Sequence, residues 1–202
     1  MADDNDAKPV LQILIASTRP GRAGEPVARW VEQIARAHDG FDVELVDLAE
    51  VALPFVDEPN HPFMRQYTQQ HTRDWSARVA RADAFVFVAP EYNYGVSAVL
   101  KNALDFLFFE WQYKPVGVVS YGGVSAGTRG VQALKGSLDG LKLSLVFDNV
   151  YIPFVQELIA DGTLNANEIM DDAAGRMLNE LQRMEQALRP LRDGVRDWVA
   201  AG

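Results

Sequence analysis

Apolar positions along the chain gather into short runs, separated by longer segments whose apolar residues recur at helical spacing. Four of the runs are apolar almost throughout, which is typical of parallel strands buried on both faces. A fifth, residues 41–48, alternates apolar and polar positions and predicts a strand near a sheet edge. The four apolar runs are residues 10–16, 84–89, 115–120 and 143–147, and the last either continues or kinks into residues 150–152.

The segments between these runs predict helices. Proline near residue 26 suits a first helical turn, and Ser97 is a suitable N-cap. Pro190 should kink or end the last helix. Residues 49–63 and 153–166 are expected to be loops. The expected helices are residues 25–38, 64–82, 97–109, a segment that follows residues 126–130 and ends near 140, and residues 167–191.

The alternation of strands and helices predicts a parallel sheet with helices on both faces. Five strands with one ligand-rich crevice fit a flavodoxin-like α/β three-layer sandwich with strand order 2-1-3-4-5, whose switch point lies between the first and third strands. We expect a short disordered lead over residues 1–8 and a single domain over residues 9–202, with a long C-terminal helix.

Composition narrows the classes of function. The chain has 202 residues and a net charge of -9, which argues against nucleic acid and anionic membranes as partners. The absence of cysteine excludes disulfides, thiolate metal sites and cysteine nucleophiles. The three histidines lack the spacing of metal ligands. The polar start of the chain is not a signal peptide and no apolar run is long enough to span a membrane, so a cytoplasmic location is expected.

The loop after the first strand, residues 17–24, has the features of an anion site. It leads into a helix N-terminus, where free N–H groups and the helix dipole favour a phosphate. Ser17 and Thr18 add hydroxyl groups, and Arg19 and Arg22 add positive charge. Neither a Walker loop nor a GxGxxG motif is present, so a mononucleotide phosphate is the expected ligand. The alternative is a flexible surface loop with solvated arginines.

Two further loops follow the third and fourth strands. Residues 90–95 (PEYNYG) offer two tyrosines and an amide that can contact a flat heterocycle, and the glycines of residues 120–123 (SYGG) permit backbone contact. An ordinary connecting loop and a tight turn are the respective alternatives. Glu91 could act in catalysis or orient its own loop through hydrogen bonds. A phosphate at one end and a flat ring at the other describe FMN.

These loops, together with residues 100–105 (LKNALD), resemble the NADPH-dependent FMN reductase family over roughly residues 8–155. That family has the flavodoxin-like fold and includes quinone, chromate and azo-dye reductases. Many members have Gly at the position of Ala16. Many also have a Ser or Asn near residues 23–25, where this chain has Ala23, Gly24 and Glu25. Phosphate binding should therefore depend more on backbone N–H groups, Ser17 and Arg19.

The resemblance implies bound FMN, NADPH or NADH as hydride donor, and a homodimer or homotetramer that packs through residues 97–111. The expected reaction passes hydride to FMN and then electrons to a small acceptor by a ping-pong mechanism, with no catalytic side chain. A flavodoxin-type electron carrier and a redox-sensing flavoprotein are the alternatives. The expected cofactor-binding residues are Ser17, Arg19, Gly24, Glu25, Pro26, Val27, Pro90, Glu91, Tyr92, Asn93, Tyr94, Gly95, Ser120, Tyr121, Gly122 and Gly123.

Overall fold

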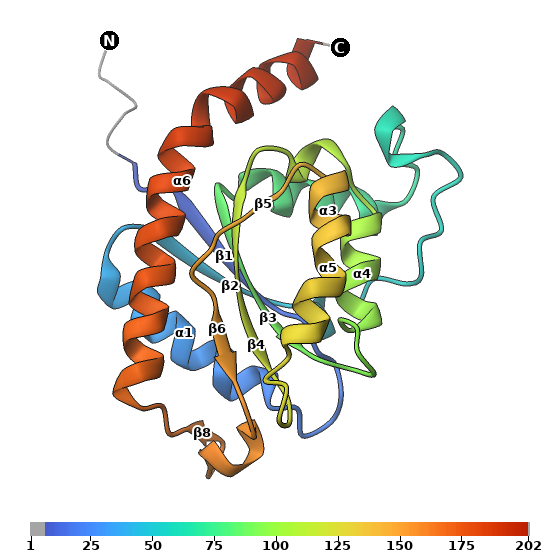
Figure 1. Ribbon diagram of the computed structural model, residues 1–202. Coiled ribbons are helices and arrows are strands. Elements are labelled where there is room, and N and C mark those ends of the chain that lie inside the picture. Colours follow the sequence, from blue (N-terminus) through green and yellow to red (C-terminus); the bar gives the residue numbers. More distant parts are fainter. Residues whose placement is uncertain (1–6, 202) are drawn as a thin grey trace.

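The computed structural model describes residues 7–201, with side chains up to Arg196, and shows a parallel sheet between two layers of helices (Figure 1). The expected lead, residues 1–8, lies outside the described residues except for its last two positions. The strands follow the predicted order β2-β1-β3-β4-β5, and β6 also pairs with β4. The main strands are β1 (Val10–Ile15), β2 (Asp42–Asp47), β3 (Ala84–Pro90), β4 (Pro115–Tyr121), β5 (Ser144–Leu145) and β6 (Val150–Ile152).

The helices cover both faces of the sheet. On one face lie α1 and α6, and on the other lie α3, α4 and α5 (Figure 1). Successive residues of β1 and β3 enter the two apolar cores alternately, since strand side chains alternate between faces. This explains why these strands are apolar throughout. The helices are α1 (Gly24–His38), α2 (Leu48–Val51), α3 (Gln70–Arg81), α4 (Ala98–Asp105), α5 (Thr128–Gly140) and α6 (Glu168–Ala201).

The prediction of a helix over residues 64–82 was wrong in its first third. A short 3-10 turn (Pro62–Met64) ends at Arg65, and α3 begins only at Gln70. Between them, the Glu58 carboxylate accepts hydrogen bonds from the backbone N–H groups of Thr68 and Gln69. This long-range contact holds the segment away from helical geometry.

The helix that begins after Ser97 is shorter than predicted. Ser97 caps it as expected, with its hydroxyl accepting from the N–H of Leu100 at 3.2 Å, but α4 ends at Asp105 and a 3-10 turn (Phe109–Trp111) follows. Most of the large apolar side chains in residues 104–111 are buried in the core of their own chain. Their excess therefore does not by itself indicate an interface between copies.

The fifth strand position is split, which confirms the kinked alternative. Both β5 and β6 pair with β4, and between them the Oδ1 of Asn149 accepts the N–H of Val118 at 2.6 Å. A side chain thus replaces the missing strand partner. After β6, the expected loop contains a 3-10 turn (Val155–Leu158) and a small hairpin, β7 (Ile159–Ala160) with β8 (Thr163–Leu164).

The last helix continues past Pro190 to Ala201 and does not end near residue 191. Pro190 lacks an N–H and crowds the preceding turn, and the helix changes direction in its last third (Figure 1). Beyond the proline, Arg192 and Arg196 bind Asp83, just before β3. These contacts hold the extension against the sheet.

The described residues contain neither a helix suited to a membrane nor a cluster of metal-binding side chains. None of the helices combines the length and the apolar character that crossing a bilayer requires. In the same part of the chain, no three His, Asp or Glu side chains come together in a way that could hold a metal ion.

Candidate functional site

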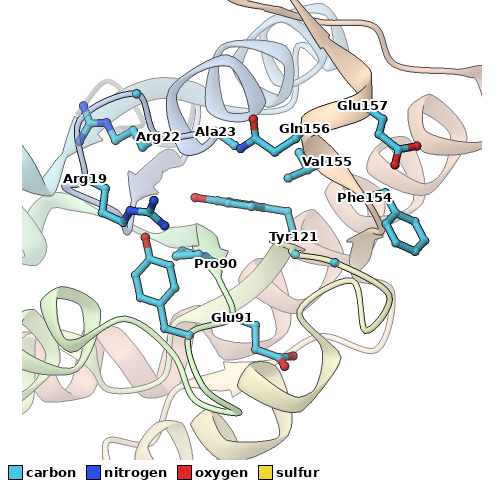
Figure 2. A pocket seen from close by; sticks show the side chains of 14 residues that line it. Arg19, Arg22, Ala23, Pro90, Glu91, Tyr121, Phe154, Val155, Gln156 and Glu157 are labelled. Atoms are coloured by element: carbon cyan, nitrogen blue, oxygen red, sulfur yellow. The ribbon is translucent and has the colours of Figure 1, made fainter.

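A cavity of about 370 Å³ lies at the carboxyl edge of the sheet, where the loops after β1, β3, β4 and β6 meet (Figure 2). Ligands bind at this edge in open α/β sheets because the strand ends and helix N-termini converge there. The lining residues are Arg19, Gly21, Arg22, Ala23, Pro90, Glu91, Tyr92, Tyr121, Gly122, Gly123, Phe154, Val155, Gln156 and Glu157.

The two arginines of the β1–α1 loop have different roles. Arg22 makes a bidentate ion pair with Asp47 at the end of β2 and donates a hydrogen bond to the carbonyl of Ser17. Its charge is therefore compensated, and it holds the loop to the neighbouring strand. Arg19 is exposed, and no hydrogen bond or ion pair links its guanidinium to any other residue in the described part of the chain. Its side chain points into the cavity (Figure 2).

Ser17 is covered from the cavity by Tyr121. The serine side chain is fully buried, and the Tyr121 hydroxyl donates to its Oγ at 3.2 Å. Gly24 makes this contact possible, since a Cβ there would stand 2.3 Å from the serine Oγ and 2.7 Å from the tyrosine hydroxyl. Burial raises the pKa of Tyr121 to about 12, with partial opposition from its hydrogen bond to Ser17. The phenol is therefore a neutral part of the cavity wall.

The β3–α4 loop is a tight turn that presents Tyr94 outward. Tyr92 and Gly95 exchange two backbone hydrogen bonds of 2.9 and 3.0 Å, and Asn93 and Tyr94 between them both have positive φ, as in a type I′ turn. The guanidinium of Arg129, on α5, lies 3.8 Å from the centre of the Tyr94 ring. Such a cation–π contact stabilises an otherwise exposed aromatic side chain.

Glu91 connects this turn to the β4–α5 loop. Its carboxylate is paired with Arg129 and accepts from the Ser125 hydroxyl at 3.0 Å and the N–H of Gly130 at 3.4 Å. Burial alone would raise the pKa of Glu91, but these hydrogen bonds outweigh it and hold the pKa below its usual value. The structure therefore supports the loop-orienting role over the catalytic one.

The segment after β6 was not anticipated as part of the site. Phe154, Val155, Gln156 and Glu157 form the wall opposite Arg19 (Figure 2). The N–H groups of Phe154 and Val155 donate to the carbonyls of Gly123 and Gly122, both at 3.3 Å, so they are attached to the predicted SYGG turn. One signal in the sequence could have predicted this wall. The carboxyl ends of all parallel strands meet at one edge of the sheet, so the loop after the fifth strand also lies there.

Some predicted site residues line the cavity and others do not. Val27 lies in the core, Ser120 donates to the carbonyl of Ala126 at 2.8 Å, and Glu25 is exposed away from the cavity. Predicted residues at the cavity are Arg19, Pro90, Glu91, Tyr92, Tyr121, Gly122 and Gly123; those set back from it are Ser17, Gly24, Glu25, Pro26, Val27, Asn93, Tyr94, Gly95 and Ser120.

Comparison with known families agrees with this geometry. The model of the NADPH-dependent FMN reductase family matches residues 10–157, which include the first three loops and the wall at residues 154–157. The chain belongs to this family. Members are oxidoreductases that use FMN as cofactor and NAD(P)H as electron donor.

Individual relatives agree with the assignment to the FMN reductase family. An NAD(P)H-dependent FMN reductase of Nectria sp is 36% identical over 196 residues, covering 94% of this chain and 96% of its own. An NAD(P)H-dependent FMN reductase of Schizosaccharomyces pombe is 45% identical over 121 residues. That match covers 59% of this chain and only 60% of the relative's own length. Among solved structures, the flavoenzyme FerB of Paracoccus denitrificans shares the fold, with a TM-score of 0.71 at 18% identity over 89% of this chain and 98% of its own.

The cavity residues fit the cofactor of this family. A volume of about 370 Å³ lies within the range of small-molecule sites. Arg19 and the free N–H groups at the start of α1 suit a phosphate, and a Cβ added at Gly123 would meet nothing within 4 Å, so the backbone there is open to a flat ring. Ser17 could donate to the phosphate only if Tyr121 moved aside.

Proposed function

We propose that this protein is an FMN-dependent NAD(P)H oxidoreductase that reduces small electron acceptors. One observation carries the proposal: a single cavity has an uncompensated guanidinium and a helix N-terminus at one end and glycine and tyrosine walls at the other. This is the chemistry that a phosphate joined to a flat ring requires. Bound FMN supplies the redox chemistry by accepting hydride from NAD(P)H.

The protein's own residues position the cofactor without transferring protons. The Glu91 carboxylate is engaged by Arg129, Ser125 and Gly130. The Tyr121 hydroxyl stays protonated at neutral pH, because its pKa is raised to about 12. We propose that donor and acceptor reach the cofactor through this same cavity in turn, which is a ping-pong mechanism.

The acceptor is proposed to be a small organic molecule. Relatives of this chain include a protein of Arabidopsis thaliana named NADPH:quinone oxidoreductase and one of Staphylococcus saprophyticus named FMN-dependent NADPH-azoreductase. Quinones and azo compounds are flat, and both can accept two electrons. These names support flat two-electron acceptors for this chain as well.

Pairing of two copies is a second part of the proposal. Exposed apolar side chains gather in the loop that precedes α3, where Phe63 lies 5.5 and 5.2 Å from the rings of Phe108 and Phe109. This surface adjoins the segment 97–111 that the family resemblance implicates in assembly. The exposed side chains of the loop are Phe55, Val56, Phe63 and Met64. They support a homodimer or homotetramer that buries them.

Anaerobic titration of the purified protein tests the enzymatic proposal. We expect a yellow protein whose absorbance near 450 nm bleaches when NADPH or NADH is added and returns when a quinone follows. A protein that neither carries nor takes up FMN would contradict the proposal. A yellow protein that neither nucleotide reduces would instead favour an electron carrier, a role that the net charge of -9 could also serve.

A further inference from the structure

Four charged side chains line the cavity, and two of them are compensated by partners outside it. Arg22 is paired with Asp47, and Glu91 is paired with Arg129. The remaining two are Arg19 and Glu157. The electrostatic character of the cavity therefore depends on Arg19 and Glu157.

Arg19 and Glu157 stand on opposite walls, with the Arg19 guanidinium turned into the cavity and the Glu157 carboxylate turned outward at the rim (Figure 2). Within the described residues, no hydrogen bond or ion pair reaches the exposed Glu157 carboxylate, and only its backbone N–H is engaged, with the carbonyl of Phe154 at 2.9 Å. The cavity is therefore positive at the β1–α1 loop and negative at the turn after β6. A cofactor phosphate would bind at the positive end, which would place its ring and any acceptor stacked on it towards the negative end.

Phe154 stands beside Glu157 on the same rim (Figure 2). The residue is 49% exposed, and its backbone has φ of 47°, in the left-handed region. Few large residues adopt that conformation, and those that do are often held in place at binding sites. Here two backbone hydrogen bonds to the turn at Gly122 and Gly123 hold the segment. An exposed aromatic ring in this position offers a flat acceptor a surface to stack on.

We propose that Phe154 and Glu157 determine acceptor specificity: Phe154 stacks on flat acceptors, and Glu157 favours neutral or cationic ones over anions. This inference rests on the proposed function, because it assigns the acceptor end of the same cavity. The acceptor reaction it concerns is balanced: a quinone takes two electrons from the reduced cofactor and two protons, giving hydroquinone and oxidised cofactor.

The expected effect is modest. One charge acting across several ångströms of partly hydrated cavity changes the relative affinity for a monoanion about three- to tenfold. Salt should suppress most of this effect, since the Debye length falls from about 10 Å at 0.1 M to about 3 Å at 1 M. The strongly negative net charge, -9 in the wild type, repels anions at long range in every variant. It therefore does not account for differences between the variants.

Two quinones with the same ring system test the proposal: 1,4-naphthoquinone and 1,4-naphthoquinone-2-sulfonate, whose sulfonate group adds one negative charge. Calorimetry with the oxidised, FMN-loaded protein gives the dissociation constant of each without turnover. Rates of flavin reoxidation are then measured after reduction with dithionite. Because dithionite replaces NAD(P)H, failure of this test is distinguishable from failure of the proposed nucleotide-dependent activity.

We expect Glu157→Gln to raise affinity for the sulfonate relative to the neutral quinone about three- to tenfold at low salt, and Glu157→Lys to raise it further. Asp161→Asn is the matched control, because Asp161 is exposed in the β7–β8 turn but does not line the cavity. An unchanged ratio in Glu157→Gln, or an equal shift in Asp161→Asn, would overturn the charge assignment. Phe154→Leu should weaken both quinones equally, and unaltered binding would overturn the stacking role.

Discussion

The two edges of the sheet both gather charged side chains, but they use them differently. At the amino edge, Asp83, Glu185, Arg192 and Arg196 bind one another. At the carboxyl edge, the cavity retains one cation and one anion without partners among the described residues. A concentration of charge therefore does not identify a site by itself. The informative feature is a charge that borders a cavity and remains uncompensated.

The amino edge is a structural joint between helices. The Lys114 ammonium is buried and donates to the carbonyls of Val79 and Ala80 at the end of α3, at 2.7 and 3.3 Å. Burial lowers the pKa of Lys114 well below its usual value. Arg196 also donates to the carbonyl of Ala80. These cations satisfy the free carbonyls and complement the dipole at a helix C-terminus. Their presence at this edge is therefore accounted for without a ligand.

The largest effect that distinguishes the two edges should come from Glu185→Ala. Glu185 is fully buried and paired with Arg189 and Arg192, and its removal leaves the Arg192 charge buried with one partner fewer. We expect a loss of about 3 to 5 kcal/mol in the free energy of unfolding, measured by urea denaturation, with FMN affinity unchanged. Gln186→Ala, an exposed neighbour, should change stability by less than about 0.5 kcal/mol. A loss below about 1 kcal/mol in Glu185→Ala would remove this structural role.

The buried contact between Tyr121 and Ser17 at the carboxyl edge should make the stability of the protein fall at alkaline pH. The pKa of Tyr121 is raised to about 12, against about 10 in the unfolded chain, so the folded state favours the neutral phenol. This stabilisation is fully present below pH 10 and is lost as the pH rises through 12. The difference in unfolding free energy between wild type and Tyr121→Phe should therefore fall by about 2.3 kcal/mol between pH 9 and 12, out of about 2.7 kcal/mol in total. A constant difference would contradict the raised pKa.

The smallest of these effects concerns the uncompensated cation. Arg19→Ala should raise the dissociation constant of FMN about tenfold, equivalent to about 1.4 kcal/mol, because it removes a charged donor at the phosphate end. The unfolding free energy of the FMN-free protein should change by less than about 0.5 kcal/mol, since the side chain is exposed. Arg176→Ala, an exposed arginine on α6, is the matched control. Unchanged FMN retention would exclude Arg19 from the phosphate site.

Features that depend on local periodicity could be predicted from the sequence. The apolar runs and the cap at Ser97 agree with the structure because they depend on neighbouring residues. The strand order also agrees, because the alternation of strands and helices, together with right-handed crossovers, leaves few possible topologies. The predictions failed where distant contacts decided the outcome. Glu58 held residues 68 and 69 out of the expected helix, and α6 continued past Pro190 to a joint with Asp83.

By itself, then, the sequence determined the layers, and it placed three of the four loops that line the cavity at one edge of the sheet. Only the tertiary structure decided which charges there remain available. Arg22 and Asp47 are 25 residues apart, and Glu91 and Arg129 are 38 apart, so their pairing depends on how separate loops meet. The same holds for the wall at residues 154–157, which reaches the cavity because β6 extends the fifth strand position along β4.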